Sequence, residues 1–138
     1  MLDRSSAGTA AAVWLAPGRT AVGPGTLVRS GLVWAPLRLG PAAFRRRISL
    51  TTAFEHEAQR ALTGPYWHLF VLGVDSAAQR RGHGGGLLAP VLATRVPCYL
   101  ETTEEANLAF YARHGFAVTV HHVEDGLPPF WTMTRAPR

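Results

Sequence analysis

A short stretch rich in glycine and arginine holds the residues with the clearest chemistry. It covers residues 79–86 and lies between an apolar run that ends at Val74 and another that begins at Leu87. Glycine lets a backbone approach a ligand closely, and N–H groups at the start of a helix attract anions. Arg80 and Arg81 add forked donors that suit phosphate. The pattern predicts a strand, an anion-binding loop and a helix, with a ligand that carries phosphates.

Two common nucleotide-binding motifs fit this loop poorly. A P-loop needs a lysine after its glycines, and the chain contains no lysine. A dinucleotide fingerprint needs a further glycine at the position of Leu87, and it begins directly after its strand. Glu101 does end the next predicted strand, where a ribose-binding acid is expected. Dinucleotide binding therefore stays open as the weaker alternative, as does a glycine-rich turn without a ligand.

The elements around the loop alternate between strands and helices. Apolar and β-branched runs predict strands at residues 9–15, 66–74, 96–101, 116–120 and 130–133. Helices are predicted at 41–62, at about 84–94 with a kink or break at Pro90, and from an N-cap at Thr102 to His114. Apolar residues also recur at helical spacing over 26–39. The second half thus predicts the order β-α-β-α-β-β, with a parallel crossover around the loop.

Composition limits the class of protein. A chain of 138 residues with 47% hydrophobic and 17% charged residues suits one globular domain. Its net charge of +5 favours a polyanionic ligand or partner, although arginine in place of lysine also follows from genomic base composition. The only cysteine, Cys98, lies in an apolar run and is predicted to be a buried strand residue.

Nothing in the sequence predicts export or a metal centre. The first 16 residues make a poor signal peptide, and no apolar run approaches the roughly 20 residues of a membrane span. We therefore expect a cytoplasmic protein. The pair His121-His122 has no third ligand at metal-like spacing, so no metal site is predicted. The run Arg45-Arg46-Arg47 is interpreted as a solvated helix face rather than a membrane or nucleic-acid contact.

Three motifs in order resemble the GNAT-type N-acetyltransferases. Residues 79–84 fit the pattern Gln/Arg-x-x-Gly-x-Gly of the acetyl-CoA pyrophosphate loop in that family. The preceding residues 72–74 resemble its fourth strand. Asn107, Tyr111 and the following Gly115-Phe116 resemble its later Asn-x-x-x-Tyr helix and Gly-Phe exit. The similarity covers about half of the chain, from about residue 67 to 134.

The resemblance assigns a role to each matching position. It implies that acetyl-CoA is the acyl donor and that backbone groups of Leu72 and Val74 bind its pantetheine arm. Tyr111 is then the general acid for the leaving thiolate, or else only a packed aromatic residue. The remaining positions that the resemblance implies for the cofactor are Gln79, Arg80, Arg81, Gly82, His83, Gly84, Gly85 and Asn107.

The base that deprotonates the amine is less well marked. Glu101 is the first candidate because it ends the fifth strand of the implied fold, and His68, near the start of the fourth, is the second. Both could instead be structural, with a chain of waters in their place.

We therefore expect an α/β domain with a mixed central sheet and helices on both faces, without the first strand and two helices of the family. Its parts are an unstructured start at 1–8, a helical insertion at 19–65 and a cofactor-binding half at 66–135.

The predicted function is transfer of an acetyl group to a small-molecule or peptide amine by direct attack. A CoA-binding module without activity is the alternative, because elements that wall the acceptor site in the family are missing. A third is a basic surface-binding protein that uses Arg45 to Arg47. The acceptor cannot be read from the sequence, and a homodimer stays open.

Overall fold

A single six-stranded sheet organises the molecule. The computed structural model describes residues 2–4, 8–18 and 41–137. Its strands are β1 (Leu2–Arg4), β2 (Ala10–Leu15), β3 (Trp67–Val74), β4 (Cys98–Thr102), β5 (Ala117–His122) and β6 (Phe130–Arg135). The helices are α3 (Pro41–Ala61), α4 (His83–Leu92) and α5 (Leu108–Arg113), with short 3-10 turns η2 (Ser76–Ala78) and η3 (Glu105–Asn107).

The strands lie in the order β1-β2-β3-β4-β6-β5, and of these neighbours only β3 and β4 run parallel. The predicted parallel crossover through α4 and the order β-α-β-α-β-β are confirmed. A mixed sheet of this kind differs from the parallel, doubly wound sheet on which dinucleotide-binding folds are built. The fold therefore argues against the dinucleotide alternative.

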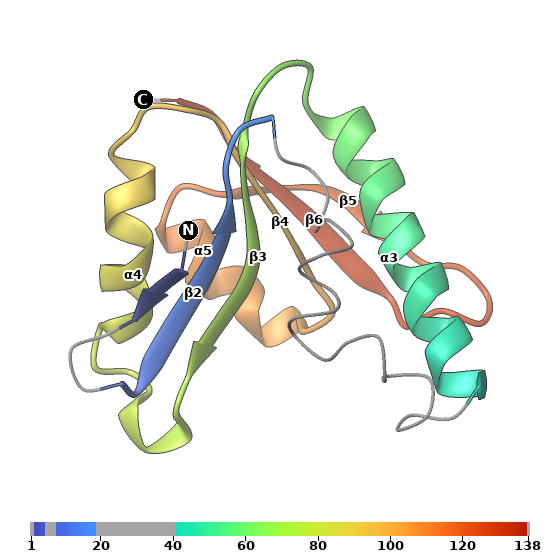
Figure 1. The fold of residues 1–138 in the computed structure, drawn as a ribbon, viewed down its shortest axis with the longest axis horizontal. Coiled ribbons are helices and arrows are strands. Elements are labelled where there is room, and N and C mark those ends of the chain that lie inside the picture. Colours follow the sequence, from blue (N-terminus) through green and yellow to red (C-terminus); the bar gives the residue numbers. More distant parts are fainter. Residues whose placement is uncertain (1, 5–7, 19–40, 138) are drawn as a thin grey trace.

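The helices cover both faces of the sheet (Figure 1). On one face, α4 packs against β2 and β3, and residues of α4, α5 and the strands form the apolar core. Trp14, Leu88, Leu100 and Met133 are almost completely buried there. On the other face, α3 packs against β6, where the rings of Phe54 and Phe130 meet edge to face at 4.7 Å.

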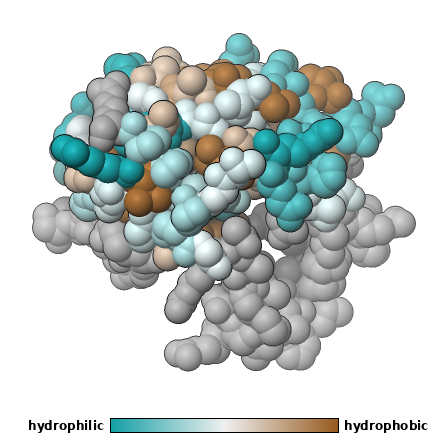
Figure 2. Space-filling model, turned by 90° about the horizontal axis from the view of Figure 1, so that it is seen from above, coloured by the Kyte–Doolittle hydropathy of each residue, from teal (hydrophilic) through white to brown (hydrophobic). Residues whose placement is uncertain are grey.

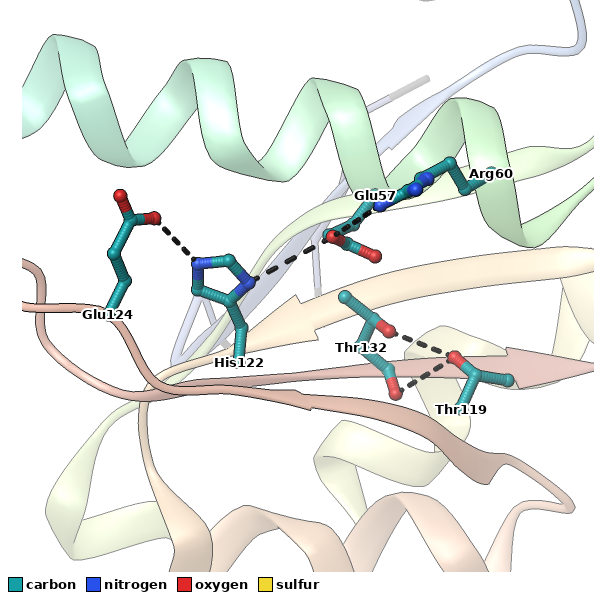
Figure 3. A network of polar contacts seen from close by, with 6 residues as sticks. All are labelled: Glu57, Arg60, Thr119, His122, Glu124 and Thr132. Atoms are coloured by element: carbon teal, nitrogen blue, oxygen red, sulfur yellow. Dashed lines mark hydrogen bonds and ion pairs between the residues drawn. The ribbon is translucent and has the colours of Figure 1, made fainter.

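A second contact fixes α3 over the β5–β6 hairpin (Figure 3). His122 of β5 points toward α3, with Nδ1 at 3.9 Å from Glu57 Oε1 and Nε2 at 3.1 Å from Glu124 Oε2. Beneath it, the Thr119 hydroxyl bonds to the hydroxyl of Thr132 at 2.9 Å. His122, the last residue of β5, thus lies between two carboxylates.

Several sequence expectations need correction. The start predicted to be unstructured contains a strand, Leu2–Arg4, which pairs with β2. The helix predicted at about 84–94 is α4 (His83–Leu92), and it is not broken at Pro90. Thr102 is not a helix N-cap: it is the last residue of β4, and its hydroxyl accepts a bond from the Glu104 N–H at 3.2 Å.

Other expectations are confirmed or concern residues that the structure does not describe. The 41–62 helix is confirmed as Pro41–Ala61, and Cys98 is fully buried in β4. The helical spacing at 26–39 and the side chains of Arg45, Arg46 and Arg47 lie outside what the structure describes.

Candidate active site

The parallel pair β3 and β4 opens partway along its length. Register pairs join the strands from Trp67 and Cys98 as far as Leu69 and Leu100. Beyond that point β3 continues to Val74 along β2, and β4 continues to Thr102 along β6. The centre of the sheet therefore contains an opening in which each strand is paired on its outer side.

A bulge marks the residue at which the opening begins. Leu69 pairs with Trp14 and Val71 with Val13, so Phe70 is an extra residue on β3. Bulges bend a strand and increase its twist, which accounts for β3 leaving β4 here. Phe70 and Val71 are 48% and 47% exposed although β3 is a central strand. The opening thus exposes apolar side chains in the middle of the sheet.

The glycine and arginine loop connects the open end of β3 to α4. Asp75 caps η2 by accepting the Ala77 N–H at 2.9 Å, and the Gln79 side chain donates to the Val74 carbonyl at 3.3 Å. Arg80 has a φ of 62°, an uncommon value for a residue with a side chain. Arg80 and Arg81 are exposed, and neither forms an ion pair with another described residue.

Three glycines shape the start of α4 in different ways. Gly82, the N-cap, has a φ of 82° that favours glycine. A Cβ on Gly84 would lie 3.2 Å from the Phe110 ring, and one on Gly85 would lie 2.8 Å from His114 Nε2. Gly84 and Gly85 therefore allow α4 to lie close to α5. A Cβ on Gly86 would meet nothing within 4 Å.

The N-terminus of α4 offers a group of backbone donors. The Gly86 N–H bonds to the Gly82 carbonyl at 3.0 Å. The N–H groups of His83, Gly84 and Gly85 precede that bond and have no acceptor within the helix. Together with the helix dipole they make a favourable position for an anion.

Asn107 and Tyr111 differ in their surroundings. Asn107 is exposed at the N-cap of α5 and makes no side-chain capping bond. Tyr111 is buried in the apolar core, with its ring 5.2 Å from that of Phe110 and 6.0 Å from that of Phe116. Burial raises the pKa of the Tyr111 phenol above its usual value. The hydroxyl therefore keeps its proton at neutral pH, as a proton donor must, although it is a weaker acid.

The two candidate bases lie side by side. His68 Nε2 is 2.7 Å from Glu101 Oε2, and their side chains are 15% and 6% exposed. The pair links β3 to β4 close to the last register pair, at the start of the opening. Two residues that the sequence offered as alternatives therefore form one hydrogen-bonded unit.

Two buried polar atoms, one in this pair and one next to it, have no hydrogen-bond partner among the described residues. They are Glu101 Oε1 and the Tyr99 hydroxyl. The Tyr99 ring lies 5.3 Å from His68 and 5.8 Å from Tyr66. Burial, and then the charge of Glu101, raises the pKa of Tyr99. Sequence reasoning missed Tyr99, although its place two residues before Glu101 puts both on one face of β4.

The predicted acid and base occupy opposite faces of the sheet. Leu100 packs with Tyr111 in the core beneath α4 and α5, and Glu101, the next residue on β4, points to the face that α3 covers. Leu72 and Val74 lie along the opening between these faces, half-buried against the core.

The described residues contain no group of three or more His, Cys, Asp and Glu side chains that could hold a metal ion. No helix within 2–4, 8–18 and 41–137 is both long and apolar enough to cross a membrane. Cys98, whose pKa burial raises, is poorly suited to act as a nucleophile.

The solved structures with this fold include three acetyltransferases. The histone acetyltransferase HPA2 and related acetyltransferase from Corynebacterium glutamicum matches 99% of this chain, with a TM-score of 0.57 and 20% identity. An agmatine N-acetyltransferase and the Drosophila melanogaster polyamine N-acetyltransferase, which forms N-acetylagmatine, each match 93% of it, with a TM-score of 0.59 and 16% identity. No protein-family model matches the chain.

The chain spans 63% of the length of the first protein and 69% of each of the other two. The predicted mixed sheet with helices on both faces is confirmed. These likenesses show the fold: the chain has the fold of the GNAT-type N-acetyltransferases.

Proposed function

We propose that the protein is an N-acetyltransferase that transfers an acetyl group from acetyl-CoA to a primary amine by direct attack. The observation that carries this proposal is the opening between β3 and β4, which has the donor-rich N-terminus of α4 at one end and the His68–Glu101 pair at the other. One feature suits a phosphate-bearing thioester, and the other suits an amine that must lose a proton.

The residues around α4 fit a CoA ligand. The N–H groups of His83, Gly84 and Gly85 would bind pyrophosphate oxygens, and the exposed Arg80 and Arg81 would add positive charge. Gln79 supports the loop through the Val74 carbonyl. Acetyl-CoA supplies an acetyl group activated as a thioester.

Backbone groups along the opening would hold the rest of the ligand. Leu72 and Val74 belong to the part of β3 that no longer pairs with β4, and Asn107 is exposed at the start of α5. Backbone donors fixed in a sheet can stabilise the negative charge that develops on a thioester oxygen.

Proton transfer is assigned to groups on the two faces. The amine nitrogen forms the new bond to the acetyl carbon, and the carbon–sulfur bond breaks. Glu101, with His68, accepts the proton that the amine loses, and the Tyr111 hydroxyl donates a proton to the leaving sulfur. Solvent then returns Tyr111 and the pair to their starting states.

Binding and turnover measured on one sample test the proposal. We expect CoA and acetyl-CoA to raise the melting temperature, and acetyl-CoA with a panel of primary amines to release free thiol. CoA binding without transfer to any amine would favour the binding-only alternative. The absence of both CoA binding and acetyl transfer would overturn the proposal.

A further inference from the structure

Two consecutive apolar side chains lie on one face of β3 at the start of the opening. We call them the apolar patch and define it as Phe70 and Val71. In a regular strand neighbouring side chains point to opposite faces, but the bulge at Phe70 interrupts this alternation. Leu69 and Leu72, on either side of the patch, both pack into the core beneath α4 and α5. Phe70 and Val71 therefore both point to the opposite face, which α3 covers.

Two contacts of the patch agree with this placement. The Phe70 ring meets the His68 ring edge to face, with 6.1 Å between the ring centroids. Val71 pairs with Val13 of β2, and Val13 points away from the core because its neighbour Ala12 is buried there. The apolar patch is therefore next to the histidine of the candidate base.

The patch is exposed although β3 is a central strand. Phe70 and Val71 are both half-exposed. Single exposed apolar residues are common in proteins, and in the view of Figure 2 apolar residues are interspersed with hydrophilic ones. The patch differs because its two side chains are adjacent and lie beside His68, which bonds the buried carboxylate of Glu101 at 2.7 Å. Apolar walls with a few well-placed polar groups are typical of ligand sites.

We infer that the acceptor is a monoamine whose nitrogen is joined to an apolar chain or ring, and that the apolar patch binds this apolar part. The inference rests on the proposed function, because the acceptor nitrogen must lie beside the His68–Glu101 pair to lose its proton. The part of the acceptor that follows this nitrogen then lies over the patch, where contact between them removes apolar surface from water.

The surroundings disfavour both a second charge on the acceptor and a second copy of the chain. Among the described residues, Glu101 is the only acidic side chain that forms an ion pair with His68. A second ammonium group would lose its water on the patch without gaining a counter-charge. Two half-exposed side chains also offer far less than the roughly 800 Å² that each partner buries in a stable protein interface.

Amines of equal length that differ at one end give the test. The second-order rate constant kcat/KM is measured for pentylamine, 5-amino-1-pentanol and 1,5-diaminopentane, with acetyl-CoA at saturation. The wild type should prefer pentylamine over each of the other two by about tenfold, the scale of one mismatched group in an apolar site. Phe70→Ala should remove most of that preference, chiefly by raising KM for pentylamine.

Matched variants separate the patch from a general loss of structure. Val71→Thr replaces a methyl group with a hydroxyl of similar shape and should lower the preference by about two- to fourfold. Val118→Thr makes the same change on β5 at a side chain that is equally exposed, at 47%, and should leave the preference unchanged. Phe70→Leu keeps an apolar side chain and should keep most of the preference.

Three kinetic outcomes would overturn the inference while the observed transfer leaves the proposed function intact. They are equal rate constants for the three amines, a preference for the diamine, and an unchanged preference in both Phe70→Ala and Val71→Thr. A wild type that sediments as a dimer, together with a monomeric Phe70→Ala, would also overturn it, because a second copy would then cover the patch.

A binding measurement decides the inference if no amine is acetylated. Calorimetric titration of the full chain with pentylamine and with 5-amino-1-pentanol should show tighter binding of pentylamine, reduced in Phe70→Ala. Equal or undetectable binding of both amines would overturn the inference. If Phe70→Ala fails to fold, Val71→Thr compared with Val118→Thr still decides.

Discussion

The two faces of the sheet carry groups of opposite charge near the opening. On the face of α4 and α5, the loop presents the exposed Arg80 and Arg81 and the N–H groups at the start of a helix. On the face of α3, the carboxylate of the His68–Glu101 pair lies beside the rings of Tyr66 and Tyr99. One face suits a polyanion and the other a cation, and the opening between β3 and β4 connects them.

The faces also differ in how their sites are built. The loop face uses backbone donors whose directions glycines allow, within one short stretch of chain. The α3 face uses side chains that only the strand pairing brings together, since His68 and Glu101 are 33 residues apart. A substitution on the first face should therefore act mostly through backbone fit, and one on the second through charge and proton transfer.

The largest expected effect concerns the α3 face. Glu101→Gln keeps the shape of the side chain but removes its capacity to accept a proton. We expect kcat to fall by roughly 10²–10⁴-fold with little change in CoA affinity, measured by free-thiol release and calorimetry. Glu124→Gln, an exposed carboxylate near the same face, should retain full turnover. Unchanged turnover in Glu101→Gln would remove this pair from the mechanism.

The next effect belongs to the face of α5. Tyr111→Phe removes only a hydroxyl, so we expect kcat to fall by roughly 10-fold or more while CoA affinity stays within about twofold. Burial raises the pKa of Tyr111 above 10.0, so the wild type should show no loss of rate from its deprotonation below about pH 10. A falling limb at lower pH that Tyr111→Phe abolishes would show that the pKa of Tyr111 is not raised, and an unchanged kcat in Tyr111→Phe would remove Tyr111 from the mechanism.

Alanine substitutions at Gly85 and Gly86 test whether α4 must lie close to α5 on the face that carries the loop. Alanine at Gly85 would place its Cβ 2.8 Å from His114 Nε2, and the His114 ring is held by a bond from Nδ1 to the Phe110 carbonyl at 2.9 Å. Alanine at Gly86 meets nothing. Because both gain the same helix propensity, we expect Gly85→Ala to be less stable than Gly86→Ala by about 1–3 kcal/mol in urea unfolding. Equal stabilities would show that α4 and α5 are not closely packed.

The contrast between the faces explains what the sequence could and could not predict. The loop was predictable because its residues are contiguous and glycine has few other reasons to recur there. The pairing of His68 with Glu101 depends on the register of β3 and β4, which no local pattern encodes.

Local signals also failed where tertiary contacts were stronger. Thr102 was predicted to be the N-cap of a helix, but β4 continues its pairing with β6 through Thr102 and Trp131. The helix therefore begins later, as η3 and then α5. The bulge at Phe70 had no sequence signal either, because an aromatic residue is typical of an ordinary strand.

The smallest expected effect concerns the hydroxyl of Tyr99, which is buried on the α3 face. Tyr99→Phe removes a buried hydroxyl without a partner, so we expect a gain of about 1 kcal/mol in the free energy of unfolding at pH 7. Burial and the charge of Glu101 hold the folded pKa of Tyr99 above that of the unfolded chain, so wild-type stability falls as pH rises past about 10. The variant should lose less stability there. A variant less stable than wild type at pH 7 would mean that the Tyr99 hydroxyl is already paired, for which the neighbouring carboxylate of Glu101 is the nearest candidate.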